Sequence, residues 1–363
     1  MKNIAKPLNS HVDSTSPPRI AIVLSTWNGE QYLPELLESL RLQTWVHWDL
    51  WVRDDGSVDG TLAILQDFSK KMNNKSTGRR IHVIEGENLG VVRSYFTLIS
   101  RIHGSYIAYA FSDQDDVWLP VKLERAASAI VNHQSGDNGD NLPFLYHSGQ
   151  LLVDQRFGRQ TMSSAPVRTG FANALIQNQV VGCTMVINPA LRECLLHGIS
   201  SQPGSDPVSG IIMHDWWCYM LASGLGRIVY DPGPVIIFRR HEKSTTPVAA
   251  NPRLELLKRM ATLRKRNWAI LHIMRQAETF AKMYFDNEDQ TTVSNGSAPM
   301  RNRIETANIC KLSGHNRQLL ISLITLRTSG FLKRLHYLFM GEHKRAGILD
   351  TLIFRLMVLI RRF

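Results

Sequence analysis

The sequence predicts an α/β protein built on a largely parallel sheet, and the order of its apolar segments supports this class. Over residues 20–111, short apolar runs of the buried-strand type alternate with segments of helical hydrophobic spacing. Each strand–helix–strand repeat implies a parallel pair joined by a right-handed crossover. The 44% hydrophobic and 20% charged content of the 363 residues is ordinary for a folded protein and argues against disorder as the main state.

The elements expected in the first part follow this alternation. They are, in order, strand 20–24, helix 31–42, strand 48–52, helix 59–72, strand 81–84, helix 90–102 and strand 106–111. Asp59 is expected to be the N-cap of its helix, because a carboxylate there accepts hydrogen bonds from the first backbone N–H groups. Polar clusters follow three of the strands, at residues 25–29, 53–57 and 112–116. Since ligands bind beyond the carboxyl ends of parallel strands, we expect these clusters to converge on one cleft.

The pattern loosens after residue 141. The elements expected there are strands 144–153 and 180–187, helix 214–222 and strand 235–238, which suit a more mixed sheet. From about residue 252 the chain is predicted to be helical and basic. We therefore expect a flexible tail over residues 1–18, an α/β domain over 19–250 and a helical region over 251–363.

The net charge of +11 is concentrated in the last third of the chain. Residues 1–250 hold 22 Lys and Arg against 23 Asp and Glu, whereas residues 251–363 hold 20 against 8. Such asymmetry indicates an anionic partner for the C-terminal part: a membrane surface, nucleic acid or a charged acceptor. Because no nucleic-acid-binding motif accompanies the charge, nucleic acid is not expected as a partner.

Cysteine usage and the apolar segments bear on the compartment. The four cysteines are Cys183, Cys194, Cys218 and Cys310. They form no CxxC pair and are irregularly spaced, so we expect buried thiols in a reducing compartment. Residues 1–19 contain no apolar stretch of the secretory-signal type, and the apolar stretch 346–360 is interrupted by charges. We expect a cytoplasmic protein.

An acidic cluster follows the strand expected at residues 106–111. Asp113, Asp115 and Asp116 place three carboxylates in four positions, where like charges raise one another's pKa unless a cation offsets them. Mg²⁺ takes one or two carboxylates together with phosphate oxygens, and Mn²⁺ accepts similar ligands. The alternative is a solvated turn that caps the next helix. The triplet by itself does not decide between the two.

Asp54 and Asp55 form a second acidic pair after the strand at residues 48–52. Their carboxylates could accept hydrogen bonds from a ribose hydroxyl or a nucleobase N–H, or they could only shape a turn. The sequence has no GxGxxG after its first strand and no GxxxxGK[ST]. A bound pyrophosphate would therefore need another source of positive charge, which a metal at the acidic cluster would supply.

Two further clusters lie later in the chain. Asp215 is flanked by His214 and two tryptophans near an expected helix start, where desolvation would raise its pKa towards general-base use. The alternative is an N-capping Asp beside core tryptophans. His241 follows two arginines at the end of an apolar strand and could bind a metal or a phosphate, although a lone surface His is more common.

Seven short motifs follow one another along the chain. They are residues 25–29 (STWNG), 52–61 (VRDDGSVDGT), 88–90 (NLG) with Arg93, 111–118 (FSDQDDVW), 182–183 (GC), 214–217 (HDWW) and 239–241 (RRH). Together they resemble family-2 glycosyltransferases of the GT-A fold, within them the bacterial rhamnosyltransferase-like branch. The resemblance covers about residues 20–245. It implies a Rossmann-like mixed sheet of the nucleotide-diphospho-sugar transferase type with a helical C-terminal extension.

The resemblance also implies a role for each matching position. Asp215 would be the catalytic base, and Asp115 and His241 would bind a divalent cation, Mg or Mn. The residues implied in nucleotide-sugar binding are Thr26, Trp27, Asn28, Asp54, Asp55, Arg93, Asp113 and Gln114. Trp27 and Asp55 would contact the nucleobase, and Asp113 the ribose or the diphosphate.

The implied reaction is an inverting, metal-dependent transfer of a sugar to a hydroxyl of a glycan or lipid-linked acceptor in cell-surface polysaccharide synthesis. The branch favours dTDP-rhamnose as donor. A non-catalytic nucleotide- or glycan-binding protein on the same fold is the alternative. Two departures bear on this. Residues 147–149 (HSG) lack the acidic residue that relatives often carry after the Ser, and no QxxRW motif is present, which argues against a processive synthase.

Residues 315–363 combine apolar runs with basic residues. They include Arg327, Lys333, Arg334, Lys344, Arg345, Arg355, Arg361 and Arg362. A helix of this composition can lie in the interface of an anionic bilayer, or it can pack on the catalytic domain with a solvated basic face. We favour the interface, because a lipid-linked acceptor would be found there, and expect a peripheral protein on the inner face of the plasma membrane.

Overall fold

The computed structural model describes residues 17–73, 78–134, 142–154, 160–200, 206, 208–240, 263–284 and 311–360. The strands are β1 (Ile20–Thr26), β2 (Trp48–Asp54), β3 (Ile81–Glu85), β4 (Ala108–Ser112), β5 (Val117–Trp118), β6 (Phe144–Asp154), β7 (Gln160–Met162), β8 (Val186–Ile187) and β9 (Arg227–Arg240). The helices are α1 (Leu33–Arg41), α2 (Thr61–Met72), α3 (Val91–Arg101), α4 (Lys122–Gln134), α5 (Phe171–Ala174), α6 (Pro189–Ser200), α7 (His214–Leu225), α9 (Leu263–Tyr284), α11 (Gly314–Thr325), α12 (Phe331–Met340) and α13 (Ile348–Ile360), with a 3-10 turn, η1, at Gly182–Thr184.

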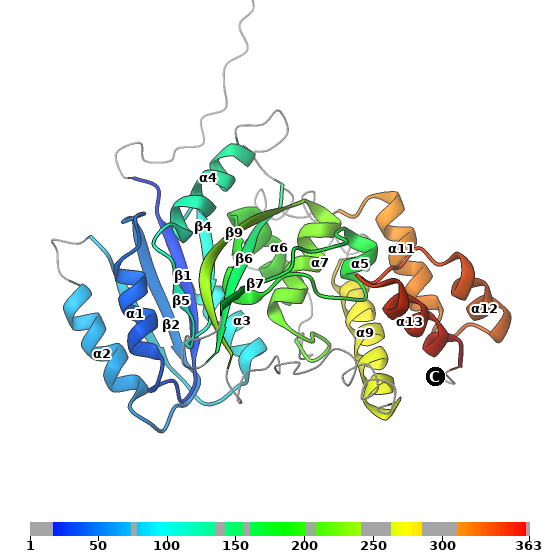
Figure 1. The fold of residues 1–363 in the computed structure, drawn as a ribbon, viewed down its shortest axis with the longest axis horizontal. Helices are drawn as coiled ribbons and strands as arrows, with labels where there is room; N and C mark the ends of the chain where they lie inside the picture. The colour runs from blue at the N-terminus through cyan, green and yellow to red at the C-terminus, as the bar shows by residue number, and fades with distance from the viewer. Residues whose placement is uncertain are drawn as a thin grey trace, which may run out of the picture.

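The described strands form one mixed sheet in the order β3-β2-β1-β4-β8-β6-β9-β5, with β7 paired to β6 (Figure 1). β1 lies between β2 and β4 and runs parallel to both, and β3 is parallel to β2. The predicted parallel pairing of the first four strands is therefore confirmed. The chain adds strands on one side of β1 as far as β3 and then crosses over for β4. This reversal beside β1 is where ligands bind in such sheets.

Both faces of the sheet are covered, and β1 shows the reason. Its side chains are buried and alternate between two hydrophobic cores: Ala21 and Val23 enter one, while Ile20, Ile22 and Leu24 enter the other. A strand buried on both faces carries a continuous apolar run, as this sequence does. Helices α1, α2 and α4 cover one face, whereas α3, α6, α7 and α9 cover the other.

Several predicted boundaries are wrong. Residues 180–187 form η1 and the short strand β8 instead of one strand, because Thr184 N–H bonds to Val181 O and closes a turn. The last strand of the α/β part is longer than predicted, since β9 continues its pairing with β6 through a register shift. Helix α2 begins at Thr61 with Gly60 as its N-cap, and Asp59 supports it from outside by accepting from Thr61 N–H at 3.0 Å. Helices α4 and α6 have no counterpart in the prediction.

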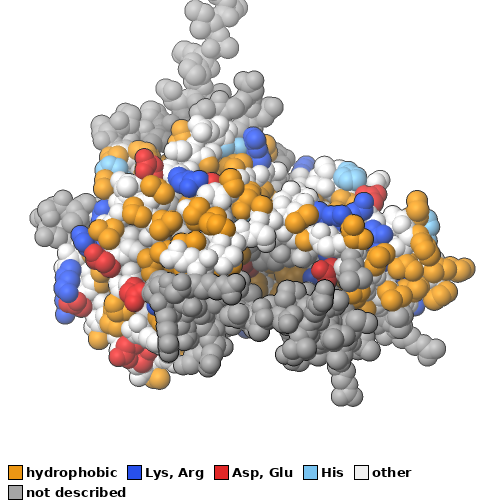
Figure 2. Space-filling view, in the orientation of Figure 1, with side chains coloured by type: hydrophobic (Ala, Val, Ile, Leu, Met, Phe, Trp, Pro, Cys, Tyr) orange, Lys and Arg blue, Asp and Glu red, His pale blue; other side chains and the backbone are white. Residues whose placement is uncertain are grey.

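The C-terminal helices pack on the α/β part. Residues of α9, α11, α12 and α13 belong to the same hydrophobic core as α3 and α7. Figure 1 shows these helices at the end of the molecule opposite α1 and α2, and Figure 2 shows hydrophobic side chains gathered at that end. None of the described helices combines the length and apolar character needed to cross a membrane. Cys183, Cys194 and Cys218 are buried free thiols as predicted, and Cys310 lies outside the described residues.

Candidate active site

The loops that follow β1 and β4 meet at one edge of the sheet, joined by the side chain of Gln114. Its Nε2 donates to Trp27 O and its Oε1 accepts from Trp27 N–H, both at 2.9 Å. Gly29 leaves the space for this amide, since a Cβ there would lie 2.5 Å from Gln114 Oε1. The pairing holds the backbone of Trp27, while the residue itself remains 54% exposed, a state in which an indole can stack on a base.

The loop after β1 is also joined to the loop after β2. Asn28 has a φ of 47°, a left-handed conformation that is uncommon outside glycine. In this conformation its N–H donates to Ser57 Oγ and its Oδ1 accepts from Val58 N–H, both at 2.9 Å. The buried hydroxyl of Thr26 donates to Asp54 Oδ1 at 2.9 Å. The convergence of all three polar clusters, predicted from the strand ends, is confirmed.

The two carboxylates after β2 hold this loop in place. Asp54 accepts from the N–H of Ser57 at 2.8 Å and from its hydroxyl at 2.6 Å, which closes a turn. Asp55 accepts from the N–H groups of Leu89 and Gly90 at 2.9 Å and forms a buried ion pair with Arg53. These bonds use most of the acceptor positions of both carboxylates. The turn-forming alternative is thus present, and contact of Asp55 with a nucleobase stays a prediction.

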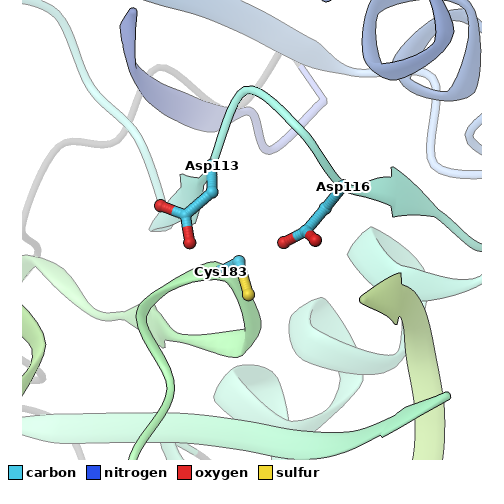
Figure 3. Close-up of side chains that lie close together, drawn as sticks. All are labelled: Asp113, Asp116 and Cys183. Carbon is cyan, nitrogen blue, oxygen red and sulfur yellow. The ribbon is translucent and has the colours of Figure 1, made fainter. Parts of the chain in front are cut away.

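Asp113, Asp116 and Cys183 form the candidate metal-binding cluster among the described residues. One ligand atom from each lies within 4.8 Å of the others, and Figure 3 shows the three side chains close together. The Tyr95 hydroxyl donates to Ser112 O at 2.5 Å and lies 3.2 Å from Asp113 Oδ1. Tyr95 therefore fixes both the end of β4 and the first carboxylate of the loop.

Negative charge is concentrated in this loop. Desolvation, then the charges of Asp115 and Asp215, raises the pKa of Asp113 to about 7. Desolvation, then the charges of Asp113 and Asp115, raises the pKa of the buried Asp116 well above its usual range. Asp115 lies in the same loop and is partly exposed. Carboxylates in this state gain from a divalent cation, which supports the interpretation of the loop as a cation site.

Lys122 lies beneath the acidic loop, and the sequence pattern did not single it out. Its Nζ donates to Cys183 O at 2.6 Å and to Phe111 O at 3.3 Å, and it lies 3.2 Å from the centroid of the Trp118 ring. Burial lowers the pKa of this ammonium to about 7. The side chain ties the end of β4 to η1 and places a cation beside the carboxylates. A lysine near a helix start is usually exposed, so no sequence signal marked it.

Asp215 lies in the first turn of α7 and is 8% exposed. Its Oδ1 accepts from Trp216 N–H at 2.6 Å, and the backbone N–H of Gly182 and the side chain of Asn178 also bond to it. Burial, partly offset by these bonds, raises the pKa of Asp215 to about 6. The predicted desolvation of this carboxylate is confirmed. A carboxylate that titrates near neutral pH is suited to general-base catalysis.

His214 connects Asp215 to the acidic loop. Its ring stacks on that of Tyr95, with centroids 4.0 Å apart, and Tyr95 in turn contacts Asp113. Burial lowers the pKa of His214 to about 3, so the imidazole is neutral and adds no positive charge beside Asp215. The candidate base and the candidate cation site are thus fixed against each other through two aromatic rings.

The remaining predicted residues lie at the margins of this cluster. Arg93, in the first turn of α3, forms an ion pair with Asp206, and both side chains are about half exposed. The buried Arg239 forms an ion pair with Glu35, and its backbone N–H donates to Asp116 Oδ1 at 3.3 Å. His241 lies outside the described residues, so its contact with a metal stays a prediction.

Comparison with known proteins identifies this arrangement. The family model described as glycosyl transferase family 2 matches residues 21–192, a range that holds all three converging loops. Residues 21–192 form a family-2 glycosyltransferase domain. This match confirms the family resemblance drawn from the motifs, and the protein is a glycosyltransferase.

Two curated relatives are glycosyltransferases by name. The dTDP-rhamnosyl transferase RfbG of Shigella flexneri is 27% identical over 270 residues, which are 73% of this chain and 86% of that protein. The Escherichia coli UDP-Glc:alpha-D-GlcNAc-diphosphoundecaprenol beta-1,3-glucosyltransferase WfgD is 26% identical over 46% of this chain and 59% of that protein. S. aureus TarS 1–349, solved in complex with UDP-GlcNAc, is 17% identical at a TM-score of 0.47, with coverage of 94% and 90%. Because that TM-score is low, the glycosyltransferase class rests on the family match and not on this structure.

The hydrogen bonds between the Gln114 side chain and the Trp27 backbone are expected to support binding of the nucleotide-sugar. Replacing Gln114 by Ala removes two hydrogen bonds worth about 1 kcal/mol each, so the KM for the nucleotide-sugar is expected to rise about tenfold or more. The melting temperature should fall by only a few degrees, because the amide is partly exposed and water can replace part of its hydrogen bonding. Steady-state kinetics with Gln66→Ala, an exposed glutamine on α2, as matched control would measure the effect. An unchanged KM would show that Trp27 needs no such support.

Proposed function

We propose that the glycosyltransferase is an inverting, metal-dependent enzyme that transfers a sugar, with rhamnose favoured, from a nucleotide-sugar to an acceptor hydroxyl. One observation carries the proposal. The pKa of Asp113, in the cation loop, is raised partly by the charge of Asp215, the candidate base, so the two carboxylates lie within electrostatic reach. Single displacement needs both groups at one reacting centre: a base for the acceptor and a site for the leaving diphosphate.

The residues of the acidic loop fit a divalent cation. Asp113 and Asp115 are partly exposed carboxylates at the strand end, and hard oxygen donors suit Mg²⁺ or Mn²⁺. Burial and the charges of neighbouring carboxylates raise the pKa values of Asp113 and Asp116, and a divalent cation would offset both effects. We assign Asp115 as the direct ligand, with His241 completing the set, and Asp113 to the ribose or diphosphate. When bound, the cation would stabilise the charge that develops on the leaving diphosphate.

The proposed reaction is a single displacement at the anomeric carbon of the donor sugar. Asp215 removes the proton of the acceptor hydroxyl as that oxygen forms its bond to the anomeric carbon. The bond from the anomeric carbon to the phosphate oxygen breaks, and the nucleoside diphosphate leaves with the electron pair. Trp27 stacks on the base, while Thr26, Asn28, Asp54 and Asp55 hold the loops that enclose the nucleoside. Arg93 leaves its ion pair with Asp206 and contacts the diphosphate of the donor.

The relatives support the choice of donor and acceptor. RfbG is by name a dTDP-rhamnosyl transferase, which supports dTDP-rhamnose as the donor of this chain. WfgD is named for transfer to a sugar on diphosphoundecaprenol, which supports a lipid-linked glycan as the acceptor of this chain. A lipid-linked acceptor lies at a membrane. We therefore propose a role in cell-surface polysaccharide synthesis at the inner face of the plasma membrane.

A thermal-shift panel of nucleotide-sugars, each with and without Mn²⁺, tests the donor. A ligand that binds only the folded state raises the apparent melting temperature, by an amount that reflects about 2.7 kcal/mol at a hundred times its Kd. We expect the largest rise with dTDP-rhamnose plus Mn²⁺ and a smaller rise without the cation. An equal or larger rise with UDP- or GDP-sugars would overturn the donor. A rise that is independent of Mn²⁺ would overturn the metal requirement for binding.

A further inference from the structure

Helix α12 presents apolar side chains to solvent. Its buried face is marked by Tyr337, which is 6% exposed. On the other side, Leu332 and Phe339 are 78% and 71% exposed and stand seven residues apart, two turns along one face of the helix. Phe331 and Met340 flank them at 58% and 68%. Surface helices of globular proteins ordinarily place charged and polar residues there, so this face lacks the expected solvation.

Helix α13 repeats the feature. Ile348, Leu352 and Leu356 are 72%, 51% and 46% exposed, and their spacing of four residues puts them in a single stripe. The opposite side of the helix is buried through Phe354 and Val358. The outward stripe carries no charged residue over two turns. The two helices pack against each other, so both stripes belong to one end of the molecule.

A buried arginine holds this end in shape. The Arg355 guanidinium, on α13, donates to the carbonyls of Leu338, Gly341 and His343 at the end of α12 and just beyond it. Arg355 is 7% exposed. Arg355 therefore clamps α12 to α13. The expectation that it belongs to a basic surface facing a membrane is wrong, because its guanidinium is buried. Because the clamp and the core contacts use the inner faces, the outer stripes are left unused by the fold.

The charge around the stripes is positive. Residues 331–360 contain five Lys and Arg, one of them the buried Arg355, and two Asp and Glu. Lys333, within α12, and Lys344, between α12 and α13, are exposed. Figure 2 shows hydrophobic side chains gathered at this end, with basic side chains next to them. Apolar side chains enter the acyl boundary of a bilayer, and exposed lysines pair with anionic headgroups.

We infer that the exposed side chains of Phe331, Leu332, Phe339, Met340, Ile348 and Leu352, together with Lys333 and Lys344, form a docking surface for an anionic phospholipid bilayer. We call these residues the α12–α13 face. The inference rests on the proposed function: it names the surface that brings the enzyme to the membrane in which the proposed lipid-linked acceptor lies. A second copy of the chain is disfavoured as occupant, because two faces of the same positive sign would repel each other. A bilayer with anionic lipid matches both the apolar and the charged component.

Vesicle co-sedimentation of the whole 363-residue chain tests the α12–α13 face. The probes are vesicles of phosphatidylcholine alone and of phosphatidylcholine with phosphatidylglycerol. We expect binding to the anionic vesicles that weakens with added salt, and at least tenfold weaker binding to phosphatidylcholine alone. The double variant Leu332→Asn/Phe339→Asn should lower partitioning to anionic vesicles at least tenfold, and Lys333→Gln/Lys344→Gln should remove most of the salt dependence.

The controls separate this inference from the proposed function. Val167→Asn changes an equally exposed hydrophobic side chain, 71% exposed, outside the C-terminal helices and should leave vesicle binding unchanged. Melting temperature and nucleotide-sugar thermal shifts should be the same in all variants, since the substituted side chains are solvent-exposed. Unchanged vesicle binding in the Leu332/Phe339 variant would overturn the inference while leaving sugar transfer untouched. Loss of self-association in that variant, seen by sedimentation velocity, would instead assign the face to a second copy.

Discussion

Replacing Asp215 by Asn is expected to lower kcat for sugar transfer by about 10²–10⁴-fold, the range found for loss of a general base. The amide cannot accept the proton of the acceptor hydroxyl. Asn has nearly the same size and can still accept the hydrogen bond from Trp216 N–H, so the first turn of α7 should keep its structure. Initial-rate kinetics should therefore show lost turnover, while calorimetry shows unchanged affinity for the nucleotide-sugar.

The pH dependence of the wild type supplies a second measurement on the same group. The pKa of Asp215 is raised from 3.8 to about 6. As the pH falls through about 6, the carboxylate gains a proton and can no longer act as a base, so kcat should fall. The matched control is Asp67→Asn, an exposed carboxylate on α2 paired with Lys71, which should leave kcat unaltered. More than a tenth of wild-type turnover in Asp215→Asn would remove Asp215 as the base.

Asp115→Asn is expected to lower turnover by about 10²–10³-fold, the cost of losing one preorganised electrostatic contact to charge that develops in the reaction. Asp115 is partly exposed, so the variant should fold as the wild type does. Turnover measured against Mn²⁺ concentration should show a large rise in the concentration for half-saturation. EDTA should abolish wild-type activity, and added Mn²⁺ should restore it.

Asp113→Asn separates the two carboxylates. If Asp113 serves the ribose or diphosphate, this variant should raise KM for the donor more than it changes the Mn²⁺ requirement. A Mn²⁺ requirement that shifts in Asp113→Asn and not in Asp115→Asn would exchange their roles. Full activity of the wild type in EDTA would contradict the metal assignment altogether.

The elements that sequence reasoning placed well are those with a strong local signal. The strand at residues 20–24 was found because burial on both faces leaves a continuous apolar run, and the helix at 31–42 because Leu33, Leu36, Leu37 and Leu40 share one face. The strand predicted at 180–187 failed because its central residues close a turn around η1. A local run of apolar residues cannot distinguish these outcomes, since both are buried.

The candidate site divides in the same way. The polar residues after β1, β2 and β4 were predictable, because the carboxyl ends of parallel strands meet at one edge of the sheet. The bonds that each side chain makes were not. Gln114 matched a motif for donor binding, yet its amide is used by the backbone of Trp27, 87 residues earlier. Asp54 and Asp55 likewise serve the backbone around them.

The sequence by itself determined the parallel strand–helix alternation, the order of the motifs and therefore the enzyme class. Those depend on residue types at short spacing, which local periodicity and strand ends express directly. Only the tertiary structure decided which groups surround the acidic loop: Lys122, whose ammonium reaches Cys183 O across 61 residues, and Arg239, whose N–H reaches Asp116 across 123. The reason is physical. Burial and Coulomb interactions depend on distance in space, so the raised pKa values of Asp113 and Asp215 arise only when β4, η1 and α7 come together.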